Sequence, residues 1–159
     1  MQLEEIQVDV LQIRGTSFRN GYIQGKQLNR ELMHTFSIME ENDRNAEAVI
    51  PIYQELAPHL VDELHGLADG LAIPFLKAAT LFGGYNIPKI KGMGCSSVIN
   101  RDFAVRNYEF SPKLYDKRLV LIQPEEGFAS IGHSLHVIGG HEGVNQGSHV
   151  CFLHEVGGA

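Results

Sequence analysis

Hydrophobic and polar positions change their period near residue 94, which divides this 159-residue chain into two unlike halves. The first half begins with a stretch over residues 5–14 that alternates between apolar and polar side chains. Alternation of this kind predicts a half-buried strand. Its apolar face is predicted to consist of Ile6, Val8 and Val10.

Apolar residues recur at helical spacing from residue 18 to residue 41, after a glycine that ends the strand. Thr16 or Ser17 can cap this helix, because a hydroxyl oxygen accepts a hydrogen bond from an N–H group of the first turn. Gly21 and Gly25 lie inside the pattern, where each lowers helix propensity by about 1 kcal/mol relative to alanine. We expect both glycines to allow close backbone packing against a neighbouring element.

Three shorter helices are predicted between residues 46 and 82. The first covers residues 46–56 and is expected to be interrupted at Pro51. The second opens at Pro58, because proline suits the first helical position, and it ends near Gly70. The third covers residues 74–82. The apolar stripe of the second helix is Leu60, Leu64, Leu67 and Leu71.

The second half consists of short strand-like runs separated by turn residues, which is typical of an antiparallel β-meander. The predicted strands are residues 95–99, 103–110, 118–122, 128–131 and 135–138, with a turn at 100–102. We therefore interpret residues 1–94 as a mostly helical segment and residues 95–159 as a β-rich segment.

Charge and hydropathy exclude several classes of protein. The chain has 13 Lys and Arg residues against 19 Asp and Glu, with a formal net charge of −6. This balance disfavours a nucleic-acid module, which needs a basic face. No secretory signal is evident, and no stretch approaches the roughly 18–20 apolar residues of a membrane span. We expect a soluble, cytoplasmic protein with no nucleic-acid or membrane partner.

The two cysteines, Cys95 and Cys151, are too few for a disulfide framework. Cys95 lies where the helical pattern gives way to strands, and it is either a core thiol or a nucleophile. A hairpin would bring Arg106 and Glu109 beside its strand. Residues three apart on a strand share a face only at a bulge or a strand end. The alternative interpretation is that Arg106 and Glu109 form a surface ion pair.

Five patches in this order resemble the N-terminal-nucleophile (Ntn) cysteine hydrolases. The relatives are the choloylglycine hydrolases, the penicillin V acylases and the acyl-CoA:6-aminopenicillanic acid acyltransferase group. The patches are Arg14-Gly-Thr-Ser-Phe with Gly21-Tyr-Ile-Gln-Gly25, then Glu63-Leu-His-Gly66-Leu-Ala-Asp-Gly70, Gly94-Cys-Ser-Ser, Arg106-Asn-Tyr-Glu-Phe and Glu142-Gly-Val-Asn.

The resemblance implies a precursor that cleaves itself between Gly94 and Cys95, so that the new α-amino group serves as the base for the thiol. It implies that Arg106 orients the nucleophile and that Glu109 holds the amine, at a position where the family normally has Asp. Asn145 would help to form the oxyanion hole, although it also suits a plain turn. The substrate would be a small-molecule amide of the bile-salt, penicillin or N-acyl amide type.

The implied fold is α+β, a helical leader followed by the start of an Ntn-type α/β/β/α sandwich with antiparallel sheets. Residues 95–159 are too few for that sandwich, and the sequence after Gln146 departs from the family pattern. We expect a truncated or frameshifted product whose open sheet edge favours a homo-oligomer. The first hypothesis is an amidohydrolase or acyltransferase, and the alternative is an inactive remnant that only folds and associates.

Five histidines in the last part of the chain raise the question of a metal. His133 and His136 are three apart, so on a strand they would point to opposite faces, and no further ligands complete a recognisable set. A papain-like pairing of Cys95 with a histidine is disfavoured, because that family's cysteine signature is absent. We expect neither a metal nor a cofactor. The histidines are His133, His136, His141, His149 and His154.

Overall fold

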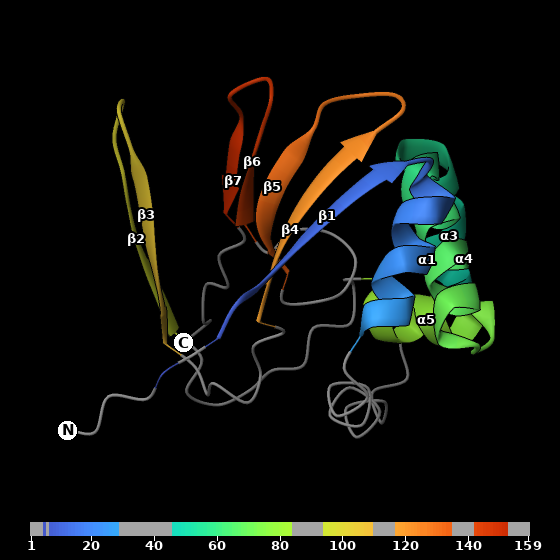
Figure 1. The fold of residues 1–159 in the computed structure, drawn as a ribbon. Helices are drawn as coiled ribbons and strands as arrows, with labels where there is room; N and C mark the ends of the chain where they lie inside the picture. Colours follow the sequence, from blue (N-terminus) through green and yellow to red (C-terminus); the bar gives the residue numbers. More distant parts are fainter. Residues whose placement is uncertain are drawn as a thin grey trace.

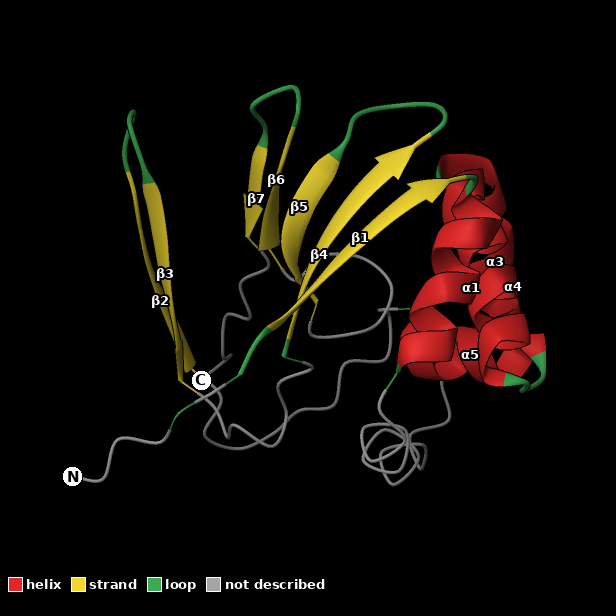
Figure 2. Cartoon of the chain, in the orientation of Figure 1, coloured by secondary structure: helices red, strands yellow, loops and turns green. Residues whose placement is uncertain are grey.

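The computed structural model describes residues 5, 7–28, 46–83, 94–109, 117–134 and 142–152. These residues form a group of helices beside a five-stranded sheet, and a separate two-stranded hairpin (Figure 1, Figure 2). The helices are α1 (Ser17–Gln27), α3 (Ala46–Leu56), α4 (Pro58–Leu71) and α5 (Phe75–Phe82). The strands are β1 (Asp9–Gly15), β2 (Gly94–Ile99), β3 (Ala104–Glu109), β4 (Arg118–Pro124), β5 (Ser130–Ser134), β6 (Glu142–Asn145) and β7 (Val150–Phe152).

Helices α1 and α4 pack against each other through glycines, with their backbones in contact. A Cβ atom added to Gly21 would overlap the carbonyl oxygen of Glu63, and one added to Gly66 would overlap that of Phe18. A Cβ atom added to Gly25 would lie 2.8 Å from the carbonyl oxygen of Leu67 in α4. The expectation that Gly21 and Gly25 allow close packing is therefore confirmed.

The start of α1 follows the predicted capping. Thr16 is the N-cap, and its Oγ1 accepts a hydrogen bond from the Arg19 N–H group at 3.2 Å. The helix ends at Gln27, and the predicted continuation to residue 41 falls outside the described residues. The sequence therefore identified this helix and its cap correctly over the described part.

The proline positions give one confirmation and one correction. Pro58 occupies the first turn of α4, as predicted. Pro51 was expected to interrupt its helix, but α3 runs through it without a break, so that expectation is wrong. An interior proline removes one N–H donor and crowds the carbonyl group four residues earlier, but the packing of Ile50 and Tyr53 against the helix core holds α3 in place. Within the described ranges, no helix is long and apolar enough to cross a membrane.

The predicted apolar stripe of α4 forms the larger core. Leu64 and Leu67 are almost fully buried, and Leu60 and Leu71 pack against the same cluster. Phe82 from α5 fills the centre of this cluster with no exposed surface. The helix group thus has its own core, made mainly from α4 and α5.

The five-stranded sheet has the order β1-β4-β5-β6-β7. Strands β4 to β7 are antiparallel neighbours in chain order, as in a meander. The predicted meander also included the β2–β3 hairpin, which forms a separate sheet, and it did not include β6 and β7. Strand β1 pairs in parallel with β4, so a strand from the first half of the sequence completes a sheet built by the second. The predicted strand at 135–138 lies outside the described residues.

Strand β1 buries the face opposite to the one that the sequence predicted. Val8 and Val10 are 44% and 71% exposed, and Ile6 lies outside the described residues. Both faces of this strand carry apolar residues, and α1 packs against the other one, so the predicted face was wrong. The buried face carries Leu11 and Ile13, which cluster with Val120, Ile23 and Ile122.

Candidate functional site

The β2–β3 hairpin carries three of the candidate catalytic positions. Its turn is closed by Asn100, whose Oδ1 accepts hydrogen bonds from the N–H groups of Asp102 at 2.8 Å and Phe103 at 2.9 Å. Asn is favoured in such turns because its side chain bonds to the backbone two or three residues further on. The predicted turn at 100–102 is therefore confirmed, and it sets the register of the hairpin.

That register brings Cys95 and Arg106 onto one face. Cys95 lies opposite Tyr108, and Ser97 lies opposite Arg106. Residues 95, 97, 106 and 108 share a face because directly opposed positions of an antiparallel pair point the same way. Arg106 is thus the diagonal neighbour of Cys95, a relation that spans about 7–8 Å and that a long side chain can bridge.

Glu109 ends β3 and lies opposite Gly94, the residue that begins β2. The pairing is regular from one end of the hairpin to the other, so no bulge turns residue 109 toward the face of Arg106. Residue 109 is nevertheless at the end of β3, and a strand end is one of the two arrangements that would let Arg106 and Glu109 approach one site. The side chains of Cys95 and Glu109 lie outside the described part of the chain.

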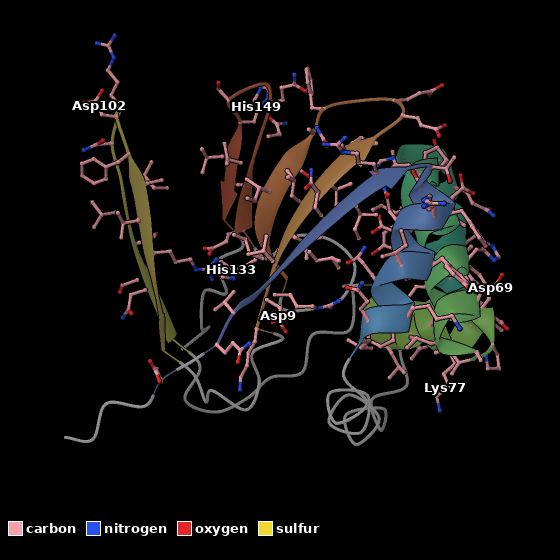
Figure 3. All side chains as sticks on the ribbon, viewed as in Figure 1. Asp9, Asp69, Lys77, Asp102, His133 and His149 are labelled. Atoms are coloured by element: carbon pink, nitrogen blue, oxygen red, sulfur yellow. The ribbon has the colours of Figure 1, made fainter. Side chains whose placement is uncertain are left out.

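Asn145 lies in the other sheet, as the last residue of β6. Its Oδ1 accepts a hydrogen bond from the His149 N–H group at 3.0 Å, and its own N–H donates to the His149 carbonyl at 3.0 Å. Both bonds close the turn between β6 and β7, where Figure 3 shows His149. The segment that the sequence presented as turn-like is therefore a strand over Glu142–Asn145 followed by a tight turn.

The structure thus places the candidate residues in two groups. Cys95, Arg106 and Glu109 belong to the hairpin, and Asn145 belongs to the five-stranded sheet. The hairpin stands apart from β7 in Figure 1, and Figure 3 shows Asp102 at its outer tip.

A buried polar cluster between α1 and α4 was not recognised from the sequence. The Gln24 Nε2 group donates a hydrogen bond of 2.6 Å to Oε1 of Glu63. Gln24 is 1% exposed and Glu63 is 7% exposed. Asn20 lies one turn before Gln24 on the same face of α1 and is 2% exposed. The glycine contacts of the helix pair hold these three side chains in one interface.

Burial gives the Glu63 carboxyl group an unusual acidity. Loss of hydration disfavours the charged carboxylate and raises the pKa of Glu63 from 4.5 to about 7, while the hydrogen bond from Gln24 lowers the pKa by a smaller amount. Titratable groups with such shifts concentrate at functional sites, although structural clusters shift them as well. Glu63 can therefore exchange a proton close to neutral pH.

A sequence signal for this cluster did exist. Glu63 lies between the leucines of the α4 stripe, three residues after Leu60 and four before Leu67. A carboxylate on an apolar helix face requires a buried partner, and Gln24 stands between the two glycines of α1. The two helices had to be paired before this signal could be interpreted.

A cavity of about 750 Å³ separates the polar cluster from the sheet. Asn20, Gln24 and Glu63 line its helix side, and Ser130 and Asn145 line its sheet side. Pockets for small organic ligands have volumes of about 300–1,000 Å³. The cavity is therefore large enough for a small molecule.

Nowhere in the described ranges do three His, Cys, Asp or Glu residues gather in a way that could hold a metal ion. His133 lies on β5 and His149 in the turn after β6. His136, His141 and His154 lie outside the described residues.

Comparison with known proteins identifies a class for the second half of the chain. Residues 98–153 match the family described as acyl-coenzyme A:6-aminopenicillanic acid acyl-transferase. This match confirms the family resemblance for the last two of the five patches. The matched segment contains Arg106, Glu109 and Asn145 and begins after Cys95. It indicates acyltransferase or hydrolase chemistry of the Ntn-related type. Among curated proteins, none matches the chain.

Proposed function

We propose that the protein is a cysteine-nucleophile amidohydrolase or acyltransferase that acts on linear amide C–N bonds, with Cys95 as nucleophile. The observation that carries the reaction class is the match of residues 98–153 to an acyl-transferring family, and Cys95 lies three residues before the matched segment. The hairpin register supports it, because Arg106 is the diagonal neighbour of Cys95. Penicillins, bile-salt conjugates and N-acyl amides are the substrate classes to test.

In the proposed reaction the Cys95 sulfur attacks the amide carbonyl carbon after the α-amino group of Cys95 has taken the thiol proton. An α-amino group has a pKa of about 7.7–8.0, so much of it is neutral near pH 7. The new C–S bond forms, the C–N bond breaks, and the proton passes to the leaving amine. Water or an acceptor amine then attacks the thioester, the C–S bond breaks, and a proton returns to sulfur.

The other candidate residues have roles that suit their chemistry. Arg106 orients the nucleophile, and Glu109 holds the α-amino group near Cys95. Asn145 donates its amide NH₂ group to the oxyanion, and a donor of this kind is worth about 10²–10³ in rate. Asn145 lies in the other sheet, so this role requires the two sheets to approach each other in the active enzyme.

The free α-amino group requires cleavage of the Gly94–Cys95 bond, and this maturation step is part of the proposal. The Cys95 sulfur attacks the carbonyl carbon of Gly94, the peptide C–N bond breaks, and the new α-amino group takes a proton. Water then hydrolyses the resulting thioester and leaves a carboxylate on Gly94. Gly94 begins β2.

Mass spectrometry of the purified chain tests the maturation step. The intact chain has a mass of 17.6 kDa, and we expect two fragments that meet at Gly94–Cys95. N-terminal sequencing of the second fragment should begin at Cys95. Cys95→Ala should stay intact, whereas Cys151→Ser, the matched change at the other cysteine, should be processed like the wild type.

Two results would contradict the proposal. A wild-type chain that stays intact for days, like Cys95→Ala, would overturn self-processing. If the processed chain released no amine from penicillin V, a glycine-conjugated bile salt or an N-acyl amide, the alternative of an inactive module would replace the enzymatic proposal.

A further inference from the structure

The sheet side of the cavity changes character from one edge to the other. One cross-strand row runs from Val120 through Gly132 and Gly143 to Cys151. A parallel row runs from Ile122 through Ser130 to Asn145. Large apolar side chains therefore give way to small or polar residues beyond β4. Residues of both rows line the cavity, together with Ile131 and Val144.

The helix side of the cavity contains a polar atom that lacks a partner. Asn20 is 2% exposed and lines the cavity, and among the described residues nothing forms a hydrogen bond with its Oδ1 atom. A buried carbonyl oxygen without a donor costs about 1–3 kcal/mol. A ligand that supplies an N–H or O–H donor would remove this cost.

The charged residues of the cavity lining indicate the charge of the ligand. Within the described chain its lining includes Glu63, Glu126 and Glu142 but no lysine or arginine. The other titratable residues of the lining are His59, His149 and Cys151. An acidic, acceptor-rich site favours a cationic donor over an anion.

The geometry points to a binding site for a small organic amine in the cavity between the α1–α4 helix pair and the sheet. The ammonium group would lie between Asn20 and Glu63, and the apolar body would lie against Val120, Ile122 and Phe128. This inference does not rest on the proposed catalytic function, because Asn20 and Glu63, which would hold the ammonium group, have no role in the proposed reaction, although Asn145 also lines the cavity.

Calorimetric titration with 2-phenylethylamine tests the inference, with 2-phenylethanol as the neutral molecule of matched size. At pH 8 the amine is protonated and Glu63, whose pKa is about 7, is mostly ionised. We expect the amine to bind and the alcohol to bind at least about tenfold more weakly, because a hydrogen bond to a charged group is worth about 1.5–3 kcal/mol. Equal binding of both molecules, or no binding at millimolar concentration, would overturn the inference.

Glu63→Gln keeps the acceptor for Gln24 but removes the charge, so it should weaken amine binding about tenfold. Glu55→Gln is the matched control, since Glu55 is exposed on α3 and does not line the cavity. Equal affinities of the two variants for 2-phenylethylamine would show that Glu63 does not bind the ammonium group. Circular dichroism verifies that both variants fold.

Discussion

The amide of Asn145 has two chemically different ends, and the local turn uses the oxygen. That oxygen accepts from the backbone of His149. An oxyanion hole needs the other end, the NH₂ donor. The interpretation of Asn145 as a turn residue and its proposed catalytic role are therefore compatible. A single side chain can fix the turn and present a donor.

Glu63 gives the sharpest prediction at the scale of one residue. Its pKa is about 7 in the folded chain and 4.5 in the unfolded chain. Between these values the folded state binds more protons, so the free energy of unfolding falls as the pH rises from about 4.5 to 7. A shift of this size corresponds to roughly 3 kcal/mol.

Replacing Glu63 by Gln should remove that part of the pH dependence. The variant keeps the hydrogen bond with Gln24 and has no charge to bury. Urea unfolding at pH 5 and pH 8 measures the effect, and the wild type should lose about 2.5 kcal/mol more than the variant between these values. A variant with the same pH dependence as the wild type would show that Glu63 titrates normally.

At the scale of helices, the α1–α4 pair depends on its glycines. Gly21→Ala adds a methyl group that would overlap the Glu63 carbonyl oxygen. Helix propensity alone predicts a gain of about 1 kcal/mol from this change. Overpacking of this kind typically costs about 1–3 kcal/mol, so we expect net destabilisation. The two physical causes predict opposite signs.

Thermal unfolding of Gly21→Ala and Gly25→Ala decides between those signs. The more severe overlap should cause the larger destabilisation. A Cβ atom at Gly21 would overlap the Glu63 carbonyl oxygen, whereas one at Gly25 would lie 2.8 Å from its nearest atom. Gly21→Ala should therefore lower the melting temperature more than Gly25→Ala. A rise for both variants would mean that the helices do not pack as closely as described.

Features that depend on neighbouring residues could be predicted from the sequence, whereas the pairing of elements far apart in the chain could not. The Thr16 cap, the position of Pro58 and the Asn100 turn all depend on neighbours within a few residues, and each is confirmed. The parallel pairing of β1 with β4 joins residues more than a hundred positions apart. Alternation alone could not reveal that partner.

The same limit explains the wrong face of β1, the unbroken helix at Pro51 and the missed polar cluster. Strand β1 is apolar on both faces, so only its packing against α1 identifies the buried one. Pro51 weakens α3 locally, and the packing of its neighbours Ile50 and Tyr53 against the helix core, which keeps α3 unbroken, could not be foreseen from the local sequence. Gln24 and Glu63 are 39 positions apart, and each becomes interpretable only beside the other.

At the scale of the whole molecule, the hairpin presents apolar side chains to solvent. Val98 and Val105 are directly opposed across β2 and β3, and they are 63% and 56% exposed. Ile99 and Phe103 near the tip are 64% and 53% exposed. Adjacent exposed apolar residues of this kind mark interaction surfaces in folded proteins.

We predict that the chain forms a homo-oligomer and that the hairpin contributes to the contact. Burying two valines contributes roughly 25 cal/mol for each Å² of apolar surface removed from water. The double variant Val98→Ser and Val105→Ser should therefore weaken self-association at least about tenfold. Light scattering after size-exclusion chromatography, over a range of concentrations, measures the mass. Ile52→Ser on α3, where the side chain is 52% exposed, is the matched control and should associate like the wild type. A monomeric mass for the wild type at every concentration would refute oligomerisation, and equal association of both variants would exclude the hairpin as the contact.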